Sequence, residues 1–148
     1  KAEDQTAVVG FNAAATLLAG LTSDRSIVQG ALDRLTDTQA SGTNIYAALE
    51  SAHQELVGER HRTGYNRSIV LVTDGIHNDP VRSADDVRAL AERIRSDDIE
   101  IVTVGLGSDI DGALLAAIAS SPDYYFAAPD AAELQAIYTE IAHLIPCP

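Results

Sequence analysis

Asp74, in the segment that ends in Thr73, Asp74 and Gly75, is the side chain in this sequence best placed to bind a ligand. Residues 69–72 are Ile-Val-Leu-Val, and such an apolar run is typical of a strand buried on both faces of a parallel sheet. The run breaks at once into polar residues, so Asp74 is predicted at the carboxyl end of a central strand. Open α/β sheets bind their ligands at that edge. Asp74 therefore places an acidic group at the mouth of a possible site, although an Asp before Gly is also a common turn former.

Alternating strand and helix patterns predict the frame that positions this group. Apolar runs predict strands at residues 6–11, 15–21, 68–72, 99–106 and 123–127. Apolar residues at helical spacing predict helices at residues 24–35, 44–59, 83–97, 109–120 and 130–144. The segment 15–21 mixes Ala, Leu and Gly, whose propensities conflict, and we interpret it as a short edge strand. Strands separated by helices pair in parallel with right-handed crossovers, so the expected fold class is α/β with three αβα layers.

Composition limits the size of the domain and the kind of partner. The chain has 148 residues, of which 46% are hydrophobic, and this is enough for one domain with a core, residues 1–148. Its formal net charge of -12 repels a phosphate backbone and an anionic membrane surface. We therefore expect neither nucleic acid binding nor membrane insertion. The single cysteine, Cys147, cannot close a disulfide within the chain.

The sequence contains no strong motif for catalysis. A P-loop and a Gly-x-Ser-x-Gly elbow are both missing, and Gly105-Leu106-Gly107 is a weak dinucleotide motif because Ile110 replaces its third glycine. We expect no enzyme. A hydrolase that uses Asp74 and His77 remains the alternative, and a turnover screen with simple esters and phosphates would detect it.

Two polar motifs and the segments around them resemble the von Willebrand factor type A domain family. Residues 41–45, Ser-Gly-Thr-Asn-Ile before a helix, are similar to the family's second motif, and residues 69–75 are similar to its third. Residues 8–11, residues 101–105 and the closing strand and helix match the family's order, so the resemblance covers nearly the whole chain. It implies a Rossmann-like, mostly parallel sheet.

In this family the motifs form a metal-ion-dependent adhesion site (MIDAS), and the resemblance implies a role for two residues here. Thr43 would supply a hydroxyl ligand, and Asp74 would supply a carboxylate that acts directly or through water. The ion would be Mg²⁺, or Mn²⁺ or Ca²⁺, and a carboxylate of a protein ligand would complete its coordination. Taken alone, Thr43 is more readily explained as a helix cap.

The chain departs from the family at its first motif. The family's Asp-x-Ser-x-Ser motif ends a strand that precedes the equivalent of residues 6–11, and that first central strand is missing here. Residues 24–28 are the nearest local match, but Val28 replaces the last Ser, and we interpret the segment as a helix cap. In the family the missing strand lies between the equivalents of residues 6–11 and 68–72, so its loss would expose two apolar strand edges. We therefore expect an amino-terminally truncated fragment, completed by its parent chain or by another chain.

The implied ligands are too few for firm metal binding by this fragment. Mg²⁺ takes about six oxygens, and two protein oxygens with water in the other positions bind it weakly. A helix that begins near Asn44 also turns a positive dipole end toward the ion. We expect weak or absent Mg²⁺ binding by residues 1–148 and a metal site in the complete domain.

Two functional interpretations follow from the resemblance. The first is an adhesion-type, protein-binding module whose rim consists of residues 36–43, 73–79 and 107–111. The second is a metal-independent scaffold domain inside the cell. The first favours an extracellular or cell-surface location over a cytoplasmic one.

Other polar residues have structural explanations. His77, Asn78 and Asp79 are expected in a solvated loop, with shaping of the rim as the alternative. His53 and His143 are expected to be packed or to satisfy helix ends. The aspartates at 85–86, 97–98, 109 and 111 are interpreted as helix caps and exposed faces.

Overall fold

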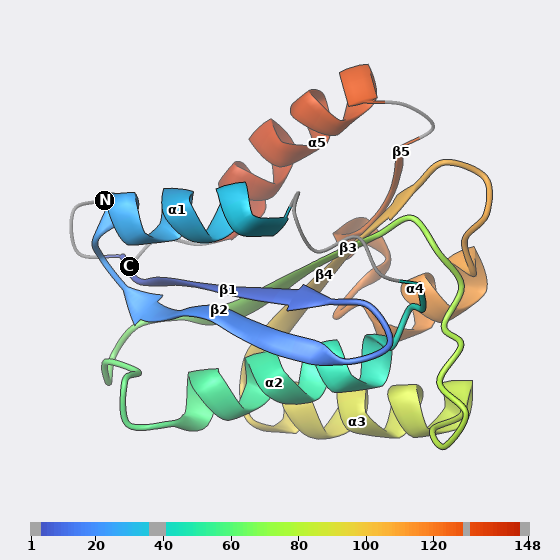
Figure 1. Cartoon of the computed structure of the whole chain (residues 1–148), viewed down its shortest axis with the longest axis horizontal. Helices are drawn as coiled ribbons and strands as arrows, with labels where there is room; N and C mark the ends of the chain where they lie inside the picture. The colour runs from blue at the N-terminus through green and yellow to red at the C-terminus, as the bar shows by residue number, and fades with distance from the viewer. Residues whose placement is uncertain (1–3, 36–40, 129–130, 146–148) are drawn as a thin grey trace.

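Two sheets, which do not pair with each other in the part of the chain described, form the middle layer of the molecule (Figure 1). The computed structural model describes residues 4–35, 41–128 and 131–145. The antiparallel sheet consists of β1 (Thr6–Phe11) and β2 (Ala15–Thr22). The parallel sheet consists, in spatial order, of β3 (Arg67–Thr73), β4 (Ile99–Leu106) and β5 (Tyr125–Ala128).

Helices cover both faces of these sheets, which confirms the expected αβα layers (Figure 1). One outer layer consists of α1 (Arg25–Leu35) and α5 (Ala131–Leu144). The other consists of α2 (Ile45–Val57), α3 (Ala84–Ser96) and α4 (Gly112–Ile118). The larger core lies on the side of α2, α3 and α4, where Ile69 and Ile101 of the sheet are buried against these helices. A smaller core lies under α5, where Val102 and Val104 contact Ile137 and Ile141.

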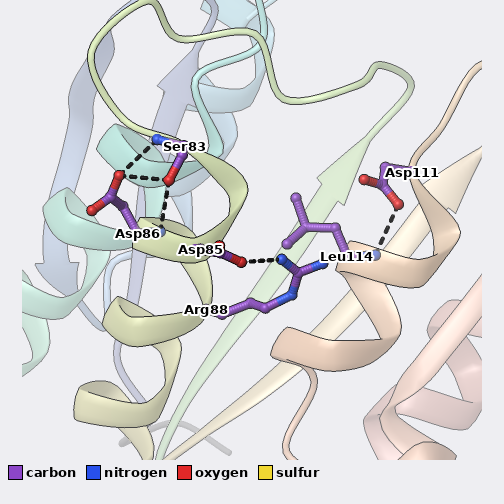
Figure 2. Close-up of polar contacts among 6 residues, drawn as sticks. All are labelled: Ser83, Asp85, Asp86, Arg88, Asp111 and Leu114. Carbon is purple, nitrogen blue, oxygen red and sulfur yellow. Dashed lines mark hydrogen bonds and ion pairs between the residues drawn. The ribbon is translucent and has the colours of Figure 1, made fainter.

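Most elements lie where the sequence predicts them. The strands at 6–11 and 99–106 have the predicted bounds, and the ambiguous segment 15–21 is a strand. The helix predicted at 109–120 is shorter, because Asp111 caps it by accepting a hydrogen bond from Leu114 N at 2.9 Å (Figure 2). Predictions for residues 36–40, 129–130 and 146–148, Cys147 among them, lie outside the described residues.

The prediction that β3 is buried on both faces is wrong. Ile69 and Leu71 are buried, but Val70 on the opposite face is 38% exposed. The reason is that β3 pairs only with β4 in the described part of the chain, so its other edge borders open space. The expected central strand is here an edge strand.

A groove of about 880 Å³ separates β1 from β3. Every residue of both strands lines it, together with apolar side chains that include Leu32 of α1, Leu49 of α2 and Tyr138 of α5. Thus the strand edges that the sequence led us to expect to be exposed face each other across one apolar groove.

Helix α2 connects the two sheets across this groove. It contacts β1 and β2 on one side and β3 on the other. Near its carboxyl end, buried Glu55 accepts a hydrogen bond from Leu21 N of β2 at 2.7 Å and pairs with Arg60 through both carboxylate oxygens, at 2.7 and 2.6 Å. The hydrogen bonds from Arg60 hold the pKa of Glu55 below its ordinary value of 4.5.

Replacing Glu55 by Gln should destabilise the fold by about 1–2 kcal/mol at neutral pH, because a charged acceptor in these hydrogen bonds becomes neutral while exposed Arg60 stays solvated. Since the folded-state pKa is lowered, the carboxylate stabilises the fold above pH 4.5 and this contribution is lost as pH falls through the folded-state pKa. Urea unfolding at pH 7 and pH 3 measures it. Glu59→Gln, at an exposed neighbour, is the matched control. An equal loss for both variants at both pH values would contradict the assignment.

Candidate metal centre

The carboxyl end of β3 places Asp74 in solvent. Thr73 is buried, and its hydroxyl accepts a hydrogen bond from Gly75 N at 3.3 Å, so the chain bends directly after the strand. Asp74, between them, is exposed. Its carboxylate is therefore accessible to an ion or a partner at the predicted edge of the sheet.

Thr43 lies against the same bend. Its Oγ1 is 2.5 Å from the position that a Cβ atom would take on Gly75, so only a residue without a side chain fits there. Thr43 and Asp74 are 31 positions apart in the sequence, yet the tertiary structure brings the hydroxyl against the residue that follows the carboxylate. The two oxygens predicted to share an ion thus come from neighbouring loops at one edge.

Asn44, not Thr43, caps α2. Asn44 is buried, and its Oδ1 accepts a hydrogen bond from Ala47 N at 2.9 Å. The structural alternative for Thr43, a helix-capping hydroxyl, is therefore taken by its neighbour. The Thr43 hydroxyl is left at the bend beside Gly75.

The residues after Gly75 lie in a loop in which Asn78 is exposed, and two of them are also hydrogen-bonded to the start of α2. Asn78 Oδ1 accepts a hydrogen bond from Thr43 N at 2.8 Å, and Asn78 N donates to Thr43 O at 3.1 Å. His77 Nδ1 accepts from Ile45 N at 3.2 Å, and His77 Nε2 lies 2.8 Å from Arg82 O. These contacts hold the loop against the start of α2, and a role in shaping a binding rim stays a prediction. Asn and His are common in loops, so their types alone did not reveal partners more than thirty positions away.

The third predicted rim segment, residues 107–111, also begins at this edge. Gly107 N donates to Ala128 O at 2.9 Å, where β4 and β5 end side by side. For the first segment, the structure describes only residues 41–43.

Several of the other singled-out residues have structural partners. Asp86 forms a capping box with Ser83 at the start of α3, and Asp85 pairs with Arg88 at 2.7 Å (Figure 2). His53 is buried, with Nε2 2.7 Å from Asp97 Oδ2. His143 Nδ1 lies 2.6 Å from Thr139 O within α5. Their contacts agree with capping and packing roles.

The donor set suits a hard divalent ion but is small. A hydroxyl and a carboxylate are the oxygen ligands that Mg²⁺ accepts. Among the described residues no group of three or more His, Cys, Asp or Glu side chains could hold a metal ion. The residues present therefore fit part of such a site, and the remaining ligands would come from water, from further chain or from a partner.

Comparison with known protein families identifies the class of domain to which this fold belongs. Residues 1–140 match the von Willebrand factor type A domain family. The chain belongs to this family, as its two motifs predict. No curated protein matches the chain.

Solved structures with the same fold include a mussel byssus matrix protein and a pilus adhesin. Proximal thread matrix protein 1 from the mussel byssus has a TM-score of 0.82 and 28% identity over 97% of this chain and 36% of that chain. A structure of the same protein with a zinc-occupied MIDAS motif has a TM-score of 0.82 and 30% identity, over 95% of this chain and 34% of that chain. The chain thus spans about a third of the mussel protein.

The pilus adhesin SpaC from Lactobacillus rhamnosus GG, in its open conformation, has a TM-score of 0.80 at 15% identity, over 95% of this chain and 25% of that chain. At this identity the likeness shows the fold alone. In the described part of this chain, each helix is too short or too polar to cross a membrane.

Gly75→Ala should displace the Thr43 hydroxyl, because the new Cβ would lie 2.5 Å from Thr43 Oγ1. Overpacking of this kind costs about 1–3 kcal/mol. Urea unfolding gives the stability, and the NMR shift of the Thr43 methyl group reports the displacement. Gly30→Ala is the matched control: a Cβ there meets no atom within 4 Å in helix α1, and Ala should stabilise that helix by about 0.5–1 kcal/mol. Equal effects of the two substitutions would show that Thr43 is not held against the bend.

Proposed function

We propose that this domain is a protein-binding module of the adhesion type that uses a divalent metal ion at the carboxyl ends of its strands. The observation that carries the proposal is the approach of the Thr43 hydroxyl to Gly75, the residue that directly follows exposed Asp74. Thr43 and Asp74 would hold the ion, and a carboxylate of the protein ligand would occupy a further position. When bound, the ion would supply the positive charge that attracts a carboxylate of the partner.

Mg²⁺ is the proposed ion, with Mn²⁺ or Ca²⁺ as substitutes. The zinc-occupied MIDAS motif of the mussel matrix protein supports a divalent ion in this family. The formal net charge of -12 favours cation binding by the chain as a whole. The matrix and adhesin neighbours support an extracellular or cell-surface location and a binding role without catalysis.

The groove between β1 and β3 supports a second part of the proposal: an additional strand, from the same polypeptide or another chain, completes the sheet. The backbone oxygen of Asn12, just after β1, accepts a hydrogen bond from Asn44 N at 2.7 Å. Thr43, the neighbour of Asn44, lies against Gly75, just after β3. Both strands therefore end at the same edge and run in one direction, so one inserted strand can pair in parallel with both.

A polar side chain in the groove also favours a peptide segment as the group that fills it. His61 lines the groove, and its Nε2 is buried without a hydrogen-bond partner in the described part of the chain. Buried polar atoms in native proteins nearly always have partners. An extended, apolar segment would cover the side chains of the groove and also offer backbone groups to His61 and to both strand edges.

Residues 1–148 alone should bind Mg²⁺ with a dissociation constant weaker than about 1 mM, because the two proposed protein oxygens are fewer than the ligands of known millimolar sites. Isothermal titration calorimetry measures the affinity. Mn²⁺ should broaden the amide NMR signals of Thr43 and Asp74 before others. Asp74→Asn should abolish this local broadening, and Asp123→Asn should not. Broadening that ignores Asp74 would contradict the metal role and favour a metal-independent scaffold.

Val70→Lys tests the open groove. With two strand edges facing an apolar groove, residues 1–148 alone should self-associate as concentration rises. Val70 is 38% exposed and lines the groove, so a lysine there should shift the protein toward the monomer. Val81→Lys, at a residue that is 80% exposed outside the groove, should leave association unchanged. Sedimentation velocity distinguishes these outcomes, and equal association of both variants would show that the groove is not the contact.

A further inference from the structure

We propose that Asp79 is a positioning residue for this centre: it holds Thr43 beside the end of β3 by anchoring Asn44, and it is not itself a ligand of the ion. The inference rests on the proposed function for its biological meaning. Its structural content, that Asp79 fixes the place of Thr43, stands on contacts that can be tested without metal.

Both carboxylate oxygens of Asp79 are already engaged. Oδ1 accepts hydrogen bonds from Val81 N at 2.9 Å and from Arg82 N at 2.6 Å, which close the loop before α3. Oδ2 accepts from Asn44 Nδ2 at 2.5 Å. The backbone hydrogen bonds from Arg82 and Val81 lower the pKa of Asp79, so the carboxylate stays charged at neutral pH. Three donors therefore take most of the roughly four lone-pair positions of this carboxylate, which leaves little room for an ion.

Asn44, which Asp79 holds, in turn restricts the position of the adjacent Thr43. Its side chain also donates to Ala13 O at 3.3 Å, and its backbone N–H donates to Asn12 O. The buried amide therefore connects the β1–β2 turn, the start of α2 and the loop that follows β3. Thr43 is the residue directly before Asn44, so its hydroxyl can stay at the bend only while Asn44 stays in place.

The two nearby carboxylates thus divide their roles. Asp74 is exposed at the end of the strand, whereas Asp79 is half-buried and tied to three donors. A negative charge close to the amino terminus of α2 also offsets the positive end of the helix dipole. Asp79 therefore lowers the cost of bringing a cation near that helix end while leaving the ion to Asp74 and Thr43.

Asp79→Ala in the chain of residues 1–148 tests the assignment through amide hydrogen exchange. Loss of the anchor should speed exchange at the amides of Thr43 and Ile45 by about tenfold or more, because their acceptors, Asn78 and His77, lie in the loop that Asp79 closes. Exchange at Val104 in the buried β4 strand should stay close to wild type. Asp85→Asn, which alters an exposed aspartate in α3, is the control and should change none of these amides.

The outcomes separate the positioning role from the proposed function. Fast exchange confined to Thr43 and Ile45 supports positioning, even if wild-type protein shows no local Mn²⁺ broadening and the metal role fails. Unchanged exchange at Thr43, or an equal increase at Val104, would overturn positioning. With the metal role intact, Mn²⁺ broadening in Asp79→Ala should weaken at Thr43 and persist at Asp74; loss at Asp74 to the same degree as in Asp74→Asn would mean that Asp79 is a ligand.

Discussion

Helix α2 packs against both sheets, and the rest of the arrangement depends on this packing because the sheets do not pair with each other in the part of the chain described. Its buried residues Ile45 and Leu49 belong to the main core, and Glu55 bonds to β2. Its amino end holds Asn44 and therefore Thr43. One helix thus sets the separation of β1 from β3 and the place of the candidate metal centre, so the groove and the centre are consequences of the same packing.

The centre has to reconcile opposing electrostatic effects. The start of α2 carries the positive end of a helix dipole, which disfavours a cation. The loop after β3 places two carboxylates near this end: Asp74 in solvent and Asp79 in hydrogen bonds to three donors. An anion that accepts backbone hydrogen bonds compensates for the dipole without using the coordination sites of the ion. The division of roles between the two residues follows from their surroundings, since their chemistry is the same.

The open groove and the small set of proposed metal ligands lie at the same edge of the molecule. The groove ends where β1 and β3 end, next to Asn12 and Thr73, and there the Thr43 loop meets the bend at Gly75. A strand that filled the groove would deliver its own carboxyl end to this place. In the proposed function, the strand that completes the sheet therefore also completes the coordination of the metal. While the groove is open, this chain is expected to bind metal weakly.

Hydrophobic periodicity in the sequence determined the elements, since buried strands and amphipathic helices leave local patterns; residues 6–11 and 99–106 show this best. The motifs around Thr43 and Asp74 also pointed to the family and to one edge. The sequence could not determine that Asp79 holds Asn44 or that Val70 faces a groove. These depend on contacts between residues more than thirty positions apart and on which strand edge has a neighbour, and only tertiary packing decides such contacts.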